Sequence, residues 1–334
     1  MNVNLPLEQS LGRLLAVAIL LFSAIILSVG NVDLKDLGLV VISSVLGILA
    51  ISPLLGEDWR PCDIFKCGPF DAIYTGPFRS ENALAIFACV TVLFVFLVHS
   101  KLHSLLSLAP ICLALYATES RTSQMALFAA LGAWVLSLVW KKLTPSGFVQ
   151  GVTLQRSLRA QTVMFSVAVL AILATAFVLI LTAVPTSFSN RGNIWIRGMG
   201  ALGEDWFVGL GLDRWTYLQT IGVVPPLFPH SQYLLLLFGG GVLSVGLMML
   251  MFCSAMSRAR RLPALFSFTV AYVLFLAVLG LTEAYWNPIA FDGHTLLVLP
   301  FILIATGRRR AQGPDAGPGS NSHRRQMNTG RLAR

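Results

Sequence analysis

The stretch TVMFSVAVLAILATAFVLILTAV, residues 162–184, decides the kind of fold that this chain adopts, because it contains no charged residue. A helix of this length crosses the roughly 30 Å hydrocarbon core of a membrane. The whole chain has the same character, since 56% of its 334 residues are hydrophobic and only 12% are charged. A soluble domain carries about 25% charged residues. The chain has too little polar surface for a soluble fold, so we expect lipid to be its solvent.

Similar apolar runs recur along the chain. They predict an all-α integral membrane protein with about nine membrane-spanning helices, in a range of about eight to ten. The expected spans are residues 13–29, 37–55, 83–99, 102–118, 122–140, 162–184, 232–253, 264–281 and 289–306. Residues 1–306 therefore form one transmembrane domain. Residues 307–334 are basic and rich in glycine, proline and serine, which predicts a disordered cytoplasmic tail.

The charges alternate between the connections of these helices, and this alternation predicts their orientation. Segments 141–160 and 254–262 are basic and contain no acidic residue, and the tail carries seven arginines against one Asp315. The acidic or neutral connections are 56–81, 185–231 and 282–294. By the positive-inside rule, the basic segments and the C-terminus are cytoplasmic and the other connections lie outside. The net charge of +9 then reflects membrane orientation and contact with anionic lipid, and we expect no nucleic-acid partner.

The connection 185–231 is the longest external segment, and we expect it to carry short helices. Its stretch 190–202 has Ile194, Trp195 and Leu202 at positions typical of an amphipathic helix, which would lie on the outer membrane face. Three prolines just before His230 stiffen the chain where it re-enters the membrane. If the protein carries out chemistry, this external segment is its expected place.

Two cysteines, Cys62 and Cys67, share the external connection 56–81. An oxidising compartment would permit a disulfide bond between them. Two free thiols are equally compatible with the sequence, because spacing alone does not establish disulfide geometry.

Six polar residues lie at the expected outer side of the membrane: Arg121, Arg191, Arg197, Arg214, His230 and Glu283. A charge near a membrane span is costly, so each of them is a candidate functional residue. Each also has a structural interpretation, such as an ion pair between Arg121 and Glu119. Together, several arginines and one histidine suit a substrate with phosphate or diphosphate, because the guanidinium group matches phosphate oxygens and stays charged. The sequence shows no ligand set for a divalent metal, and we expect no cofactor.

Several short motifs occur in order around the long external connection. They are YTGPF (74–78) followed by Asn82, SRTS (120–123), Arg191 with Trp195, GLG (209–211), and PHSQY (229–233) followed by GGG (239–241). Over roughly residues 70–285, their order and spacing resemble the O-antigen ligase/polymerase family of bacterial membrane glycosyltransferases.

The resemblance implies transfer of a glycan from a polyprenyl-diphosphate carrier to a hydroxyl of a lipid or glycan acceptor. The reaction would take place at the outer face of the bacterial cytoplasmic membrane, without a metal. Arg121 and Arg191 would bind the diphosphate and stabilise the charge of the leaving group, with Arg197 and Arg214 in a secondary role. His230 would deprotonate or orient the acceptor hydroxyl. Glu283 would also take part.

Two alternatives stay open. Within the family, the acceptor of a ligase is a lipid core or a protein, whereas the acceptor of a polymerase is another lipid-linked glycan. Outside the family, the chain could transport a small anion or a lipid-linked sugar. Transport would require polar groups near mid-membrane and broken helices. The expected spans are nearly free of charge at their centres, which disfavours transport.

Overall fold

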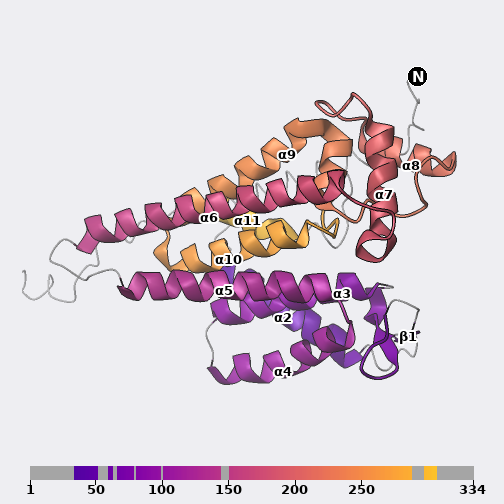
Figure 1. Ribbon diagram of the computed structural model, residues 1–334. Helices are drawn as coiled ribbons and strands as arrows, with labels where there is room; N and C mark the ends of the chain where they lie inside the picture. Colours follow the sequence, from indigo (N-terminus) through magenta and orange to yellow (C-terminus); the bar gives the residue numbers. More distant parts are fainter. Residues whose placement is uncertain are drawn as a thin grey trace, which may run out of the picture.

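The computed structural model describes residues 34–51, 59–62, 66–78, 80–98, 101–143, 150–287 and 297–306. This part consists mostly of helices that run side by side (Figure 1). The helices are α2 (Leu34–Ile51), α3 (Glu81–Val98), α4 (Lys101–Ala117), α5 (Arg121–Leu143), α6 (Gln150–Leu181), α7 (Ser187–Leu202), α8 (Leu212–Thr220), α9 (Gln232–Ala259), α10 (Pro263–Leu279) and α11 (Leu299–Thr306). The expected span 13–29, the first part of span 289–306 and the tail 307–334 lie outside the described residues.

Five of the described helices are long and apolar enough to cross a membrane: Leu34–Ile51, Glu81–Val98, Arg121–Leu143, Leu154–Leu181 and Gln232–Ala259. Shorter apolar helices fall on two further expected spans, at Leu106–Ala117 and Leu265–Leu279. Large apolar side chains point outward from the bundle, as lipid contact requires, and Phe128 is 73% exposed. The structure confirms a mostly helical fold with several helices that are long and apolar enough to cross a membrane. The total of nine spans stays a prediction.

Helix α10 forms the centre of the bundle and packs along α5. It is apolar around its whole circumference, which is typical of a helix that other helices surround. Its residues Phe268 and Tyr272 are buried and lie in a row of aromatic rings with Phe94 of α3 and Phe301 of α11. The Tyr272 hydroxyl donates a hydrogen bond to the Leu297 carbonyl at 2.8 Å, so the polar end of this buried side chain is satisfied.

The bundle has two different ends. We call the end with α7, α8 and the start of α9 the loop end, and the opposite end, where α5 and α9 finish and α6 begins, the basic end (Figure 1). At the basic end, α6 already begins at Gln150, although segment 141–160 was expected to connect two spans. Likewise α9 continues through Arg258 to Ala259. The reason is that membrane helices continue from the hydrocarbon core through the headgroup regions, where charged side chains reach polar groups. The core and the headgroup regions together are about 40–45 Å thick.

A small two-stranded antiparallel sheet lies at the loop end. Strand β1 (Trp59–Pro61) pairs with β2 (Ala72–Tyr74), with Trp59 opposite Tyr74. A disulfide bond joins Cys62 to Cys67 between the strands. The sheet is tied to α3 by Glu81, which binds Lys66 at 3.0 Å and Arg60 at 3.6 Å. The sequence analysis did not predict this sheet, because strands of three residues are too short for a readable alternation.

Reduction of the Cys62–Cys67 bond is expected to lower the stability of this region. The loop that it closes is short, so the loop-entropy model gives an effect of about 2 kcal/mol. The measurement is the melting temperature of the purified protein with and without reductant. The control is a variant with Cys62→Ser and Cys67→Ser. It should melt at the temperature of the reduced wild type, and its melting temperature should not change when reductant is added. An equal response of this variant would assign the effect to another part of the molecule.

Helix α9 contains a break at Gly240 and Gly241, visible as a bend in Figure 1. Gly241 has φ 65° and ψ −162°, a conformation that is essentially restricted to glycine. The backbone groups at the break bind segment 206–210. The Leu210 amide donates to the Phe238 carbonyl at 2.8 Å, and the Val242 amide donates to the Trp206 carbonyl at 3.0 Å. In a lipid environment, an unpaired backbone group would cost several kcal/mol, so this segment stabilises the break.

Candidate functional site

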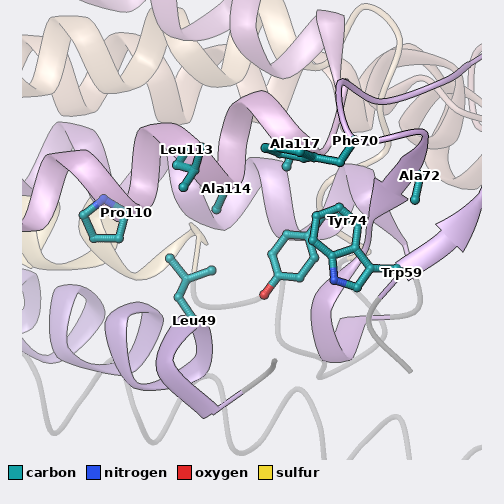
Figure 2. Close-up of a pocket in the computed structure, with 9 residues that line it drawn as sticks. All are labelled: Leu49, Trp59, Phe70, Ala72, Tyr74, Pro110, Leu113, Ala114 and Ala117. Atoms are coloured by element: carbon teal, nitrogen blue, oxygen red, sulfur yellow. The ribbon is translucent and has the colours of Figure 1, made fainter. Parts of the chain in front are cut away.

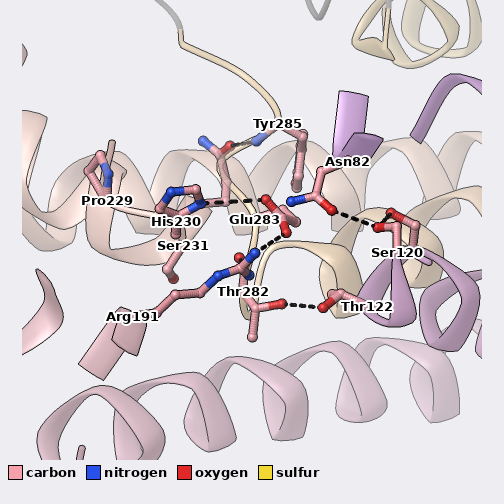
Figure 3. Close-up of polar contacts among 12 residues, drawn as sticks. Asn82, Ser120, Thr122, Arg191, Pro229, His230, Ser231, Thr282, Glu283 and Tyr285 are labelled. Carbon is pink, nitrogen blue, oxygen red and sulfur yellow. Dashed lines mark hydrogen bonds and ion pairs between the residues drawn. The ribbon is translucent and has the colours of Figure 1, made fainter. Parts of the chain in front are cut away.

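Polar side chains from the starts of α3, α5 and α9, from α7, and from the turn after α10 lie close together at the loop end (Figure 3). Glu283, in the turn after α10, is the centre of this cluster and is 6% exposed. Arg191 Nη2 donates a hydrogen bond to Glu283 Oε1 at 2.7 Å, and Arg191 Nη1 donates to the Thr282 carbonyl. His230 Nδ1 lies 3.7 Å from Glu283 Oε2. One carboxylate therefore contacts both of the residues that the sequence analysis assigned to catalysis.

The backbone before Arg191 is unusual and sets the direction of its side chain. Phe188, Ser189 and Asn190 all have left-handed conformations, with φ between 51° and 69°. Such conformations cost roughly 1–3 kcal/mol each and persist where the surroundings enforce them. The residue after Arg191 must be glycine, because a Cβ atom at Gly192 would collide with the Val184 carbonyl. This tight turn directs Arg191 toward Glu283.

His230 is also fixed by its chain neighbours. It has φ 47°, in the left-handed region. Before it, the Pro229 carbonyl accepts a hydrogen bond from Trp195 Nε1 of α7 at 3.0 Å. After it, Ser231 caps α9 by accepting from the Leu234 amide at 3.4 Å, and it donates to the Gly280 carbonyl at 3.2 Å. The imidazole is thereby positioned between α7 and the end of α10.

Helix α8 positions the segment that leads to His230. Trp215 Nε1 donates to the Leu227 carbonyl at 3.1 Å, and Gln219 Nε2 donates to the carbonyls of Leu227 at 2.9 Å and Pro225 at 3.2 Å. Between α8 and this segment the chain turns at Gly222, which has φ 73° and open space around it. The proline-rich segment is therefore bound at several carbonyls, while residues 221–223 of the turn before it are exposed.

Gln232 fixes the turn that carries Glu283. Its Oε1 accepts from the amides of Tyr285 at 3.1 Å and Trp286 at 2.9 Å, and its Nε2 donates to the Trp286 carbonyl at 2.8 Å. Gln232 is fully buried, so these bonds satisfy an amide that would otherwise be costly. The sequence analysis did not assign a role to this residue. Its place next to His230 and Ser231 at the start of a span was the available signal.

The start of α5 joins the site through hydroxyl groups. Thr282 donates to Thr122 Oγ1 at 2.9 Å, and Ser120 donates to Asn82 Oδ1 of α3 at 3.0 Å. The motifs around Asn82 and Ser120 therefore meet in space (Figure 3). Arg121 lies at the rim of the cluster. Its side chain is 77% exposed, and its Nη2 is 3.6 Å from Glu119 Oε2.

The two remaining arginines are not part of this cluster. Arg197 is exposed on α7, and the Arg214 guanidinium lies 4.7 Å from the centre of the Tyr217 ring on α8. Arg191 and Arg197 lie six positions apart, so they point in different directions on α7. Among the described residues, no group of three or more histidine, cysteine or acidic side chains could bind a metal ion.

An apolar cavity of about 620 Å³ lies between α2, the small sheet and α4 (Figure 2). It is lined by Leu49, Trp59, Phe70, Ala72, Tyr74, Pro110, Leu113, Ala114 and Ala117. Ala117 precedes Ser120 by three positions, so the cavity lies near the segment that connects α4 to the polar cluster. Its lining suits a hydrocarbon chain.

The helices and the polar cluster define a multi-pass helical membrane protein with a buried arginine–glutamate pair and a histidine at one end of its bundle. Residues 104–249, from α4 into α9, match the family model described as O-antigen ligase. The resemblance to the O-antigen ligase/polymerase family is thereby confirmed, and it supports a glycosyltransferase-like role in polysaccharide assembly. The matched segment contains Arg121, Arg191 and His230. Neither the curated proteins nor the solved structures contain a significant match.

Proposed function

We propose that the protein transfers a glycan from a polyprenyl-diphosphate carrier to an acceptor hydroxyl at the outer face of the cytoplasmic membrane. The observation that supports this proposal best is the Glu283 carboxylate, which binds Arg191 through one oxygen and faces His230 with the other. In this proposal, Arg191 is the cation that binds the phosphate, and His230 beside it is the proton acceptor. The family match supports the same class of reaction.

Arg191 is suited to bind the diphosphate of the donor. A guanidinium group has five N–H donors, and here one points to Glu283 and one to the Thr282 carbonyl. The remaining N–H groups can bind phosphate oxygens. Because the guanidinium is fixed before the substrate arrives, it can stabilise the negative charge that develops as the diphosphate leaves. Arg121, exposed at the rim, would provide a second cation.

His230 is suited to activate the acceptor. Its Nδ1 faces Glu283, so its Nε2 points away from the carboxylate on the other side of the ring. In the proposed step, the acceptor hydroxyl attacks the anomeric carbon of the donor, and Nε2 takes the hydroxyl proton. The bond between the anomeric carbon and the phosphate oxygen breaks, and the polyprenyl diphosphate leaves with the electron pair. The side chain is 29% exposed, so an acceptor can reach it.

The apolar cavity offers a place for the hydrocarbon part of the donor. It lies between α2, α4 and the small sheet, and its lining is almost entirely apolar. A polyprenyl chain there would keep its diphosphate near the loop end.

The structure gives limited support to transport as an alternative. A transporter needs helices whose broken ends are open to an ion or substrate. Helix α9 is broken at Gly240 and Gly241, but segment 206–210 already occupies the backbone groups nearest the break. Transfer therefore accounts better for the described residues.

A transfer assay tests the proposal. Purified protein receives a polyprenyl-diphosphate-linked glycan and a glycolipid acceptor, and the product is quantified over time. We expect His230→Ala to lose about 100-fold or more of the rate, as removal of a general base does. Thr216→Ala, an exposed position on α8 of the same end, is the matched control and should retain the rate. Full activity of His230→Ala would contradict the assigned role.

Product analysis separates the two activities within the family. Cells that lack a polymerase should accumulate single repeat units on the carrier. Cells that lack a ligase should accumulate long chains that are not attached to an acceptor.

A further inference from the structure

The basic end of α9 contains a recess with a different chemistry from the site at the loop end. It has a volume of about 500 Å³ and is lined by Cys253, Ser254, Ser257, Arg258 and Arg261. Four of these residues lie in the last turns of α9, which ends at Ala259, and Arg261 lies in the turn that follows. Two guanidinium groups and two hydroxyl groups therefore face the same space.

The donors of this recess suit a phosphate group. Arginine binds phosphate oxygens through paired N–H groups, and serine hydroxyls add single hydrogen bonds. Arg260 contributes indirectly, because its Nη2 donates to Ser257 Oγ at 2.7 Å and leaves the Ser257 proton available for another acceptor.

An apolar stripe leads along α9 directly to the recess. Leu243, Leu247 and Leu250 are 52%, 66% and 63% exposed, and their spacing places them on the same face of α9 as Ser254 and Arg258. This face changes from leucine to serine to arginine toward the basic end. The same order of chemistry, from acyl chains to phosphate, is found along a phospholipid molecule. A free phosphate ion would not require the leucine stripe.

We propose that this face of α9 binds an anionic phospholipid of the inner leaflet, with its phosphate in the recess and its acyl chains along the leucine stripe. Basic recesses at the cytoplasmic ends of membrane helices are suited to such headgroups. The proposal uses the orientation that the positive-inside rule predicts. It does not depend on the reaction proposed for the loop end.

Native mass spectrometry of the purified protein with phosphatidylglycerol and phosphatidylcholine tests the proposal. We expect the protein to retain phosphatidylglycerol preferentially. The double variant Arg258→Gln, Arg261→Gln should lose this retention about tenfold or more. The matched control is Arg156→Gln, Arg159→Gln, which removes two exposed arginines from α6 at the same end and should retain the lipid. An equal loss in both double variants would overturn the proposal in favour of general charge attraction.

A second variant keeps the charge constant. Ser254→Leu replaces an exposed residue, fills the recess and should also reduce phosphatidylglycerol retention. Unchanged retention in this variant would overturn the proposal. Inorganic phosphate is the competitor that distinguishes the source of the anion: if it displaces the lipid completely, the recess is a free-phosphate site. The melting temperature of these variants is measured separately, and a value close to that of the wild type shows that the protein is folded.

Discussion

Replacement of Arg191 by alanine is expected to reduce glycan transfer by about 10³-fold or more. A fixed donor to the charge that develops in a transition state contributes roughly 10²–10³ in rate when it is removed alone. Arg191→Ala also removes the partner that keeps the Glu283 carboxylate in place beside His230. Both the leaving group and the proton acceptor would therefore be affected. The measurement is the initial rate of transfer at saturating donor.

The same variant is expected to lose stability. The side chains of Arg191 and Glu283 are only 16% and 7% exposed, so alanine at position 191 leaves a buried carboxylate without its cation. Removal of one partner from a buried pair costs about 3–5 kcal/mol. Arg197→Ala is the matched control for stability, since it removes an exposed arginine from the same helix. Its melting temperature should stay close to that of the wild type.

A double variant separates the two effects. Arg191→Met with Glu283→Gln removes both charges and should recover most of the lost stability, because no buried charge is left without a partner. It should not recover transfer, because the diphosphate still lacks its cation. Recovery of transfer in the double variant would show that Arg191 acts only on the fold.

Replacement of Gly241 by alanine is expected to destabilise the protein by about 3 kcal/mol or more. The φ of 65° and ψ of −162° at this position are costly for any residue with a Cβ atom, by roughly 1–3 kcal/mol. In addition, the new Cβ would collide with the Phe207 carbonyl, so segment 206–210 would have to move away from the break in α9. The backbone groups at the break would then lose their partners.

Gly246→Ala is the matched control in the same helix. No atom lies within 4 Å of a Cβ at this position, and alanine favours a helix over glycine by about 1 kcal/mol. This variant should therefore melt at the same or a higher temperature. The prediction compares the two melting temperatures in the same detergent. If Gly241→Ala melts no lower than Gly246→Ala, the break does not need glycine.

Much of the bundle follows from hydropathy alone. The predicted spans 83–99 and 122–140 begin within one or two residues of the first residues of α3 and α5, because the lipid solvent requires long apolar helices. The amphipathic stretch 190–202 was likewise found as part of α7. The break in α9 was missed, because GGG has no unique conformation until segment 206–210 packs against it. The helix that follows Gly211 was also missed, since α8 is short and its polar residues leave too few apolar positions to show a helical periodicity.

The sequence predicted that the site residues lie on the same side of the molecule, but it did not predict which of them contact one another. Charge cost and orientation selected Arg191, His230 and Glu283 as outer-side residues. They gave no reason to distinguish Arg191 from Arg197, which differ only in the face of α7 that they occupy. The central role of Glu283 depends on a contact across some ninety positions of the chain, and one sequence contains no record of such a distant pairing.

The open turn at Gly222 has a practical use for cell biology. Residues 221–223 are exposed, and a Cβ atom at Gly222 would meet no neighbour, while the hydrogen bonds from Trp215 and Gln219 hold the segment that follows. A short epitope inserted after Gly222 would therefore be displayed to antibodies without moving His230. Staining of intact spheroplasts with such a tagged protein would report which side of the membrane this turn faces. The proposed glycan transfer can be assayed in the same sample.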